Sequence, residues 1–257
     1  MWNQIRLFAA IVVGVGLTLA SPMPAHGASG KWEYVSGDDG VKVWRKEVEG
    51  SSLMSFKGLT TVKVPIGKII QVFAFDRFQK EWVDRWADSK DLMKITPYER
   101  IFWIRFGLPW PIDDRDYVIR TNAVPDAKTR TVNAYLKSVK HSAKPEKGGC
   151  CVRGMAFGTK YRFRALPDDR TEMLVEVNTD PRGLLPSWLV NMIQKDWPRK
   201  TLLDLSRRAS KPDIESYPGM EDWHMPYQPP AAEPAAPTPP AQSGAPTPPA
   251  TAPPATK

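Results

Sequence analysis

The chain offers few side chains with the reactivity and spacing that catalysis needs. Beyond the first thirty residues its histidines are His141 and His224, which lie far apart in the sequence. Its two cysteines are neighbours, Cys150 and Cys151. This set has none of the ligand spacings that are typical of a zinc site, so we expect no metal and no other cofactor.

The adjacent cysteines have three states open to them: two free thiols, a strained vicinal disulfide, or pairing between chains. Neighbouring Cα atoms across a trans peptide lie about 3.8 Å apart, below the usual separation in a disulfide. The sequence therefore favours free thiols without excluding the other two states. In each case the chain lacks a disulfide framework, and the fold must depend on its core.

Two further stretches resemble catalytic arrangements without completing them. Residues 154–158 read Gly-Met-Ala-Phe-Gly, which has the glycines of a nucleophile elbow but alanine in place of the nucleophile. Asp113, Asp114 and Asp116 lie beside Arg115. We interpret this acidic cluster as a salt-linked turn rather than as acid–base chemistry. The sequence therefore predicts a protein that is not an enzyme.

The longest patterned stretch, residues 180–208, predicts a helix. Pro186 and Ser187 suit a first helical turn, where a missing N–H costs nothing. Pro198 should bend the helix, because it removes a backbone donor and clashes with the preceding turn. Bulky apolar residues recur at three- and four-residue spacing: Leu185, Trp188, Leu189, Met192, Ile193, Trp197, Leu202 and Leu205. A helix with so wide an apolar face must cover another layer of the fold.

Two predicted strands lead into that helix. Residues 152–165 and 171–177 alternate between apolar and largely charged side chains, with a turn between them. We expect an antiparallel pair whose apolar face meets the helix.

Charge complementarity predicts the register of this pair. Arg164 would lie opposite Glu172, and Lys160 opposite Glu176, on the outer face of the sheet. Exposed cross-strand pairs contribute only about 0.2–1 kcal/mol each, but they favour one register over its neighbours.

The order of the remaining elements predicts an α+β fold. A hairpin over residues 41–64 precedes a short helix over 66–75. Further strands are expected at residues 92–95, 100–106, 116–124 and 131–139. Runs of strands followed by a helix indicate α+β rather than a parallel α/β sheet.

Two motifs, in this order, resemble those of the StAR-related lipid-transfer (START) domains. Pro-Trp-Pro at 109–111, followed by Arg-Asp-Tyr-Val at 115–118, is similar to one signature of that family. Residues 177–191 are similar to the approach to its C-terminal helix, and the resemblance covers 31–211. The familiar members of the family act inside eukaryotic cells, whereas this chain begins with an export signal, so its ligand and partners do not carry over.

The resemblance implies a helix-grip fold of the START/Bet v 1-like kind, in which a curved antiparallel sheet surrounds a long C-terminal helix and a hydrophobic cavity. It also implies that the protein binds a lipid there without catalysing a reaction, and it leaves open whether the protein also transfers that lipid. Two alternatives remain open: a cyclase or hydrolase of the wider superfamily acting on a hydrophobic substrate, and an interaction module without a ligand.

In such a fold the inward faces of the last strands and the helix are expected to line the cavity. These residues are Met155, Phe157, Tyr161, Phe163, Met173, Val175, Trp188, Leu189, Met192 and Ile193. Ordinary core packing is the alternative for each of them. A polar anchor for the lipid headgroup would come from Arg105, Tyr117, Thr121 or Asn191, and alternation does not decide which way these four face.

The first residues read as a secretory signal peptide over 1–27. Arg6 precedes an apolar run at 7–20, and Ala25 and Gly27 are the small residues of a cleavage site. The run is short for a membrane span, which needs about 20 residues, and an uncleaved anchor is the alternative. We expect cleavage after Gly27 and export to a bacterial periplasm.

The composition divides the rest of the chain into a domain over 28–217 and a Pro/Ala-rich, disordered tail over 218–257. The formal charge of +8 favours acidic surfaces, and anionic lipid headgroups suit an exported protein better than nucleic acid. A merely basic, soluble surface is the alternative. We expect a monomer that makes transient contact with an anionic membrane surface.

Overall fold

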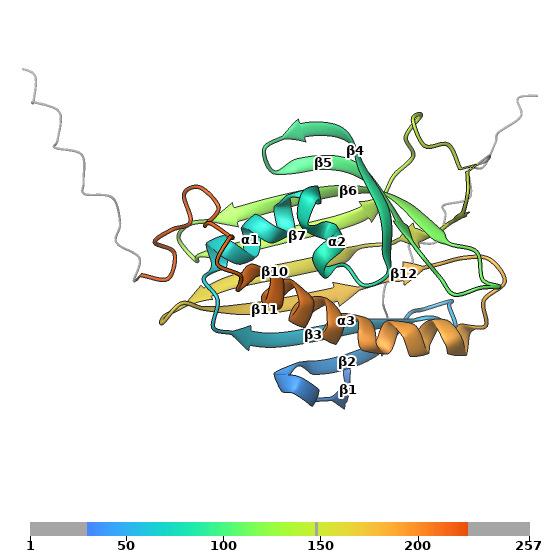
Figure 1. The fold of residues 1–257 in the computed structure, drawn as a ribbon. Helices are drawn as coiled ribbons and strands as arrows, with labels where there is room; N and C mark the ends of the chain where they lie inside the picture. Colours follow the sequence, from blue (N-terminus) through green and yellow to red (C-terminus); the bar gives the residue numbers. More distant parts are fainter. Residues whose placement is uncertain (1–29, 147–148, 226–257) are drawn as a thin grey trace, which may run out of the picture. The chain divides into compact units, whose positions relative to one another are not determined.

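The structure is a computed structural model that describes residues 30–146 and 149–225 (Figure 1). The signal peptide predicted over 1–27 lies outside the described residues, as does most of the tail predicted over 218–257.

Ten described strands form one sheet, in the order β1-β2-β3-β11-β10-β7-β6-β5-β4, with β8 beside β6. Their bounds are β1 Glu33–Ser36, β2 Lys42–Glu47, β3 Met54–Val62, β4 Trp86–Thr96, β5 Glu99–Phe106, β6 Arg115–Asp126, β7 Thr131–Ser138, β8 Val152–Arg153, β10 Thr159–Leu166 and β11 Arg170–Val177. All pairs are antiparallel except β6 with β8. The late strand β11 pairs with the early strand β3 and so joins the N-terminal strands to the rest of the sheet.

The register predicted for the last long hairpin is confirmed. Arg164 pairs with Glu172 and Lys160 with Glu176 across β10 and β11. The Arg164 guanidinium lies 3.1 Å from the Glu172 carboxylate. Charge complementarity on the outer face and apolar side chains on the inner face specify the same alignment, which a slip by one residue would reverse.

Helices lie on the inner side of the sheet. They are α1 Ile66–Ala74, α2 Gln79–Trp82 and α3 Ser187–Ala209, with short 3-10 turns η1 Asp38–Gly40 and η2 Asp76–Phe78. The long helix begins at Ser187 and contains Pro198. Pro186, predicted in the first turn together with Ser187, is the residue just before the helix. Figure 1 shows its axis changing direction near the middle.

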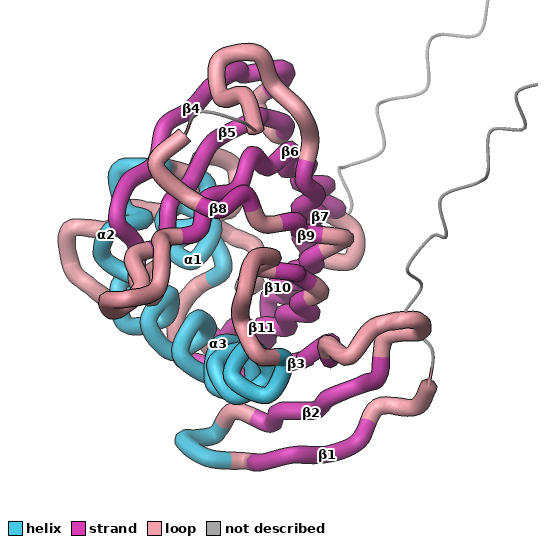
Figure 2. Tube along the Cα trace, turned by 90° about the vertical axis from the view of Figure 1, so that its right-hand side faces the viewer, coloured by secondary structure: helices cyan, strands magenta, loops and turns pink. Residues whose placement is uncertain are grey.

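The sheet curls around α3, as Figure 2 shows in the arc from β4 through β7 and β10 to β1. Where α3 crosses β3 the backbones come very close, since a Cβ on Gly58 would lie 2.8 Å from the Cβ of Pro198. Leu202 and Leu205 are fully buried there. The packing of this half of the helix therefore depends on glycine in the facing strand.

The strand predicted over 152–165 is broken into three. After β8 the chain forms the two-residue β9, Met155–Ala156, which pairs with β12, Thr179–Asp180, in a separate small sheet. Gly158 has a φ of +152°, which favours glycine, and β10 begins only afterwards. The alternation of inward and outward side chains therefore restarts at Thr159, so residues before Gly158 do not follow the pattern of β10.

The folded part of the chain continues beyond residue 217. Ile214 and Met220 are buried in the core. The Tyr217 amide donates to the Gly67 carbonyl at 3.0 Å, and Arg130 Nη1 donates to the Trp223 carbonyl at 2.9 Å. The domain predicted to end at residue 217 therefore keeps packing contacts at least as far as Trp223.

These elements make an α+β helix-grip fold, with a curved antiparallel sheet around a C-terminal helix. Across residues 30–146 and 149–225, no helix has the length and apolar character that crossing a membrane requires.

Candidate functional site

A cavity of about 540 Å³ lies between the concave face of the sheet and the helices. Strands β5 and β6 supply alternate residues to it, because successive side chains of a strand point to opposite faces. From these two strands the lining residues include Phe102, Ile104, Phe106, Tyr117, Ile119, Thr121 and Ala123.

The helix α3 supplies the facing wall of the cavity. Val190, Ile193, Gln194, Trp197 and Thr201 line it, and they recur at the three- and four-residue spacing of one helical face. The N-terminal half of the helix thus covers a hollow, whereas Leu202 and Leu205 further along lie in solid core.

The segment from α1 to α2 covers a third side. Phe73, Gln79 and Trp82 line the cavity from there. The Phe73 ring lies 4.9 Å from the Tyr161 ring of β10, measured between centroids, and 6.1 Å from that of Trp82. This aromatic cluster joins the helical cover to the floor of the sheet.

Among the lining residues predicted on the last two long strands, Tyr161 contacts the cavity. Phe163, Met173 and Val175 share its face but are fully buried in the core cluster and do not line the cavity. The reason is position along the strand, because α1 and the second half of α3 cover this part of the sheet. Phe73, for example, packs 5.1 Å from Phe163.

Met155 and Phe157 were predicted to face inward, but neither lines the cavity. Ala156 and Thr159 do. The break between β9 and β10 at Gly158 changes which residues face inward. The two-residue alternation of β10 therefore does not extend to the residues before Gly158.

On the helix, Ile193 lines the cavity, whereas Leu189 is half-buried and does not. Trp188 is exposed to solvent, since the first turn of α3 has no sheet opposite its side chain. The side chain of Met192 lies outside what the structure describes. Val190, which the sequence analysis did not select, is buried against the cavity.

Of the four candidate polar anchors, Tyr117 and Thr121 line the cavity. Arg105 does not, and its guanidinium forms an ion pair with Asp114 at 3.2 Å. Asn191 is also elsewhere. Its amide accepts from the Met54 amide at 3.1 Å and donates to a carbonyl of the segment before β3, which ties α3 to that segment.

Arg115 is a lining residue that the sequence analysis missed as a candidate. The side chain is buried, and it donates hydrogen bonds to the backbone carbonyls of Asp113, Pro181 and Arg182. It therefore holds the segment before β6 against the segment before α3. Its alternation with Tyr117 and Thr121 along β6 was the signal that could have identified it.

Gln79 and Gln194 were also missed, because a search for apolar periodicity passes over amides. Both side chains are buried and line the cavity. Gln194 lies four residues after Val190 and three before Trp197, so helical spacing alone places it on the same face.

Burial raises the pKa of the Tyr161 phenol well above its ordinary value. Burial also raises the pKa of Tyr117, with a further contribution from the negative charge of Asp180. Both phenols therefore stay protonated at neutral pH and present hydroxyl groups, not charges.

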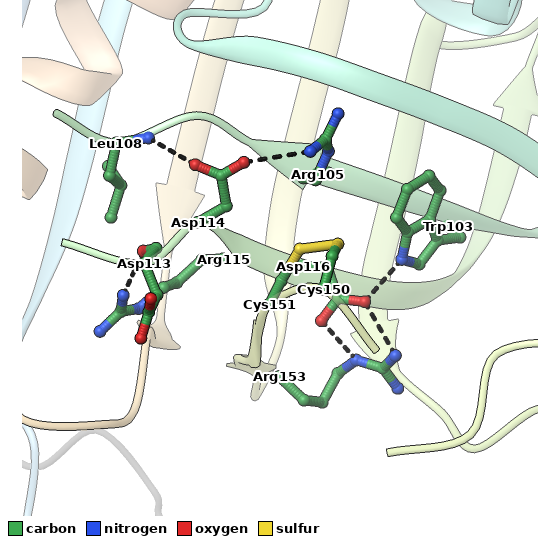
Figure 3. The surroundings of a disulfide bond; sticks show 10 residues. All are labelled: Trp103, Arg105, Leu108, Asp113, Asp114, Arg115, Asp116, Cys150, Cys151 and Arg153. Atoms are coloured by element: carbon green, nitrogen blue, oxygen red, sulfur yellow. Dashed lines mark hydrogen bonds and ion pairs between the residues drawn. A yellow bond between two sulfur atoms is a disulfide. The ribbon is translucent and has the colours of Figure 1, made fainter. Parts of the chain in front are cut away.

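The acidic cluster beside Arg115 is the salt-linked turn that the sequence predicted. Asp116 accepts from Arg153 Nε and Nη2, both at 2.9 Å, and from the Trp103 indole N–H at 2.6 Å (Figure 3). Asp114 accepts from Arg105 and from the Leu108 amide. These carboxylates are occupied in holding strands and loops together.

Cys150 and Cys151 are joined by a disulfide, so the free thiols that the sequence favoured are not observed (Figure 3). The chain bends at these residues, which brings the two Sγ atoms together although they belong to neighbours. Within residues 30–146 and 149–225, His, Cys, Asp and Glu form no group of three that could hold a metal ion.

The sequence is similar to several known proteins, although no protein-family model matches it. An uncharacterised protein of Pseudomonas aeruginosa is 29% identical over 209 residues, which is 81% of this chain and 97% of that protein. Human START domain-containing protein 10 is 23% identical over 76% of this chain and 65% of its own length. Bovine phosphatidylcholine transfer protein is 21% identical over 68% of this chain and 82% of its own length.

Solved structures share the fold. The crystal structure of human START domain-containing protein 10 superposes with a TM-score of 0.64 at 22% identity, over 69% of this chain and 72% of that one. A StAR-related lipid transfer protein fragment from Xanthomonas axonopodis gives 0.60 at 25% identity, over 70% of this chain and 99% of that one.

A sheet that closes on a C-terminal helix around an apolar hollow defines the helix-grip class of domain. Within that class, the described residues share the fold of the START (StAR-related lipid-transfer) domains. The chain is also similar in sequence to proteins of that family.

Proposed function

We propose that the protein binds a lipid in this cavity and transfers it within a bacterial cell envelope, without catalysing a reaction on it. The observation that carries the proposal is the cavity itself, of about 540 Å³, lined mainly by aromatic and aliphatic side chains. Transfer of each CH₂ group from water into such a site contributes about 0.8 kcal/mol, so a hydrocarbon chain is the natural occupant.

The relatives support this proposal. Phosphatidylcholine transfer protein and the StAR-related lipid transfer protein of Xanthomonas axonopodis carry lipid transfer in their names. Nothing comparable points to catalysis, and the lining carboxylates of Asp84, Asp91 and Glu99 are engaged in ion pairs.

A transfer protein must also meet a membrane, and we propose that it does so with three exposed apolar residues near the start of α3. Trp110, Leu184 and Trp188 are 92%, 104% and 68% exposed. The hydrogen bonds of Arg115 to Asp113 and Arg182 bring the segment that carries Trp110 beside the one that carries Leu184. Tryptophan is well suited to the membrane–water interface, since its ring is apolar and its N–H is polar.

The basic residues of α3 contribute less to this contact than their number suggests. Arg199 forms an ion pair with Asp39, and the Lys200 ammonium lies 3.8 Å from the Asp84 carboxylate. We therefore expect insertion of apolar side chains to dominate over attraction to anionic headgroups.

Export of the protein remains part of the proposal. It is supported by the charged, apolar and small-residue sections of the first 27 residues. We propose a monomer in the periplasm, released by cleavage after Gly27.

The direct test is native mass spectrometry, with lipid extraction, of the mature protein purified from the periplasm of its own host. We expect one lipid molecule per protein chain. A protein that arrives empty, and that takes up no lipid from vesicles, would contradict the proposed function.

The membrane contact is tested by exchange of a fluorescent lipid between two populations of vesicles. Trp110→Ser and Trp188→Ser should slow exchange while the lipid-loaded fraction stays constant, because these side chains lie outside the cavity lining. Tyr135→Ser is the matched control, since Tyr135 is half-exposed on β7. Equal rates for all variants would show that these tryptophans do not meet the membrane.

A further inference from the structure

Gln194, Gln79 and Tyr161 bring uncharged polar groups to the cavity lining, and one of these groups has a fixed orientation. Gln194 is 8% exposed, and its Nε2 donates to both the carbonyl and the Oγ1 of Thr179, each at 3.0 Å. A carbonyl only accepts hydrogen bonds, so the amide nitrogen must face Thr179. The Oε1 atom is therefore the acceptor on the other side, and it has no hydrogen-bond partner within the described residues.

A second amide repeats this situation on the short helix α2, which contacts α3. Gln79, on α2, is 4% exposed and lines the cavity, and its Oε1 also lacks a partner within residues 30–146 and 149–225. A buried acceptor without a donor costs free energy, about 1–3 kcal/mol for each group. Two such acceptors in one lining indicate a ligand that supplies a donor.

Tyr161 adds a hydroxyl to the same lining. Its ring is held between Phe73 and Phe163, at centroid distances of 4.9 and 5.9 Å. Burial keeps the phenol protonated, so it offers both a donor and an acceptor.

Most of the charged residues that line the cavity already have partners, and Lys94 is exposed to solvent. Arg100 pairs with Asp91 at 2.8 Å, and Arg115 donates to three backbone carbonyls. A negative headgroup placed near Arg115 would also meet Asp180, whose charge acts on the neighbouring Tyr117. An ionised headgroup would therefore lose its hydration without gaining a free counter-charge.

We propose that the ligand is an uncharged lipid whose polar group is a hydroxyl, held inside the cavity by Gln194, Gln79 and Tyr161. This inference rests on the proposed function, because it names the class of lipid for the same cavity. A hydroxyl can donate to an amide oxygen and accept from the tyrosine, whereas an ionised phosphate or carboxylate only accepts.

The test compares three ligands with the same chain: hexadecane, hexadecanol and palmitate. Binding is followed by native mass spectrometry and by tryptophan fluorescence, since Trp82 and Trp197 line the cavity. We expect hexadecanol to bind roughly tenfold more tightly than either of the others, the size of one or two net hydrogen bonds. A second arm compares diacylglycerol with phosphatidic acid, and a sterol with its sulfate ester, which separates chain alcohols from ring alcohols as sources of the hydroxyl.

Variants assign the preference to residues. Gln194→Leu and Gln79→Leu should each reduce hexadecanol binding about threefold to tenfold and leave hexadecane binding unchanged. Gln71→Leu is the matched control: its Oε1 is also buried without a partner in the described part of the chain, but it lies on α1 outside the cavity lining.

The outcomes distinguish a failure of the hydroxyl preference from a failure of the proposed lipid binding. Palmitate or phosphatidic acid binding as tightly as its alcohol would overturn the hydroxyl preference and leave lipid binding intact. A preference that survives in both glutamine variants would overturn their assignment. Failure to bind any of the ligands, hexadecane included, would overturn the proposed function itself.

Discussion

The two halves of α3 are held in different ways. The C-terminal half packs Leu202, Leu205 and Ala209 into the core with no exposed surface. The N-terminal half lies over the cavity and is tied by hydrogen bonds, from Asn191 to the segment before β3 and from Gln194 to Thr179. One helix is thus anchored by apolar packing at one end and by polar contacts at the other.

This difference indicates where the domain can open. Separating packed leucines from the sheet exposes apolar surface to water, at about 25 cal/mol for each Å². Hydrogen bonds can be exchanged for water, and each has a net value of only about 0.5–1.5 kcal/mol. We expect the cavity to open by movement of the N-terminal half of α3, while the C-terminal half stays in place.

The largest effect is expected outside α3, at the buried charge pair between Asp116 on β6 and Arg153 on β8. Asp116→Ala removes the carboxylate that pairs with Arg153 and leaves a guanidinium that is mostly buried without a counter-charge. Breaking a pair of this kind costs about 3–5 kcal/mol. Urea denaturation should show this loss in the free energy of unfolding.

The matched control is Asp114→Ala. Asp114 also pairs with an arginine, Arg105, but these two side chains are 26% and 32% exposed, against 6% and 12% for Asp116 and Arg153. Exposed pairs contribute about 0–1 kcal/mol, so the loss should be much smaller. Equal losses for the two variants would show that burial does not distinguish them.

The second prediction compares the two halves of α3 directly. Leu205→Ala should destabilise the domain by about 2–5 kcal/mol, because the surrounding core cannot fill the space that is left. Ile193→Ala should cost less, since Ile193 already borders a hollow and has fewer contacts to lose. Thermal and urea unfolding of the lipid-free protein would measure both.

The reverse order of destabilisation would contradict the proposed difference between the two halves of α3. If Ile193→Ala were the more destabilising variant, the N-terminal half of α3 would be the firmer anchor. The cavity would then have to open elsewhere.

The sequence predicts the fold well where a local pattern and a long-range requirement agree. The register of β10 and β11 follows from Arg164 opposite Glu172, because the same alignment puts the apolar face inward. The start of α3 at Ser187 is predicted to within one residue from Pro186, since proline is tolerated at a helix start but not in a helix interior.

The site is predicted less completely, because lining a cavity is not a local property. Phe163 and Tyr161 share one face of β10, yet only Tyr161 meets the hollow, and that depends on where α1 and α3 cross the sheet. Met155 was misplaced because a period-two count does not register the break at Gly158. Gln194 was missed because its role depends on which partners are absent in the folded state.

The smallest expected effect tests the boundary between the two regions, where Tyr161 contacts both the cavity and the core. The unfolded chain releases the phenol proton near pH 10, whereas burial raises the pKa in the folded protein. Above about pH 10 the folded state therefore binds more protons than the unfolded state, and stability falls by about 1.4 kcal/mol for each pH unit until the folded pKa is reached. Tyr161→Phe should remove that part of the slope when urea midpoints of the lipid-free protein are compared from about pH 9 to about pH 11.

An unchanged slope would mean that the hydroxyl ionises without unfolding. Water would then reach Tyr161 through the cavity, and the part of the core that excludes water would begin at Phe163 and not at Tyr161.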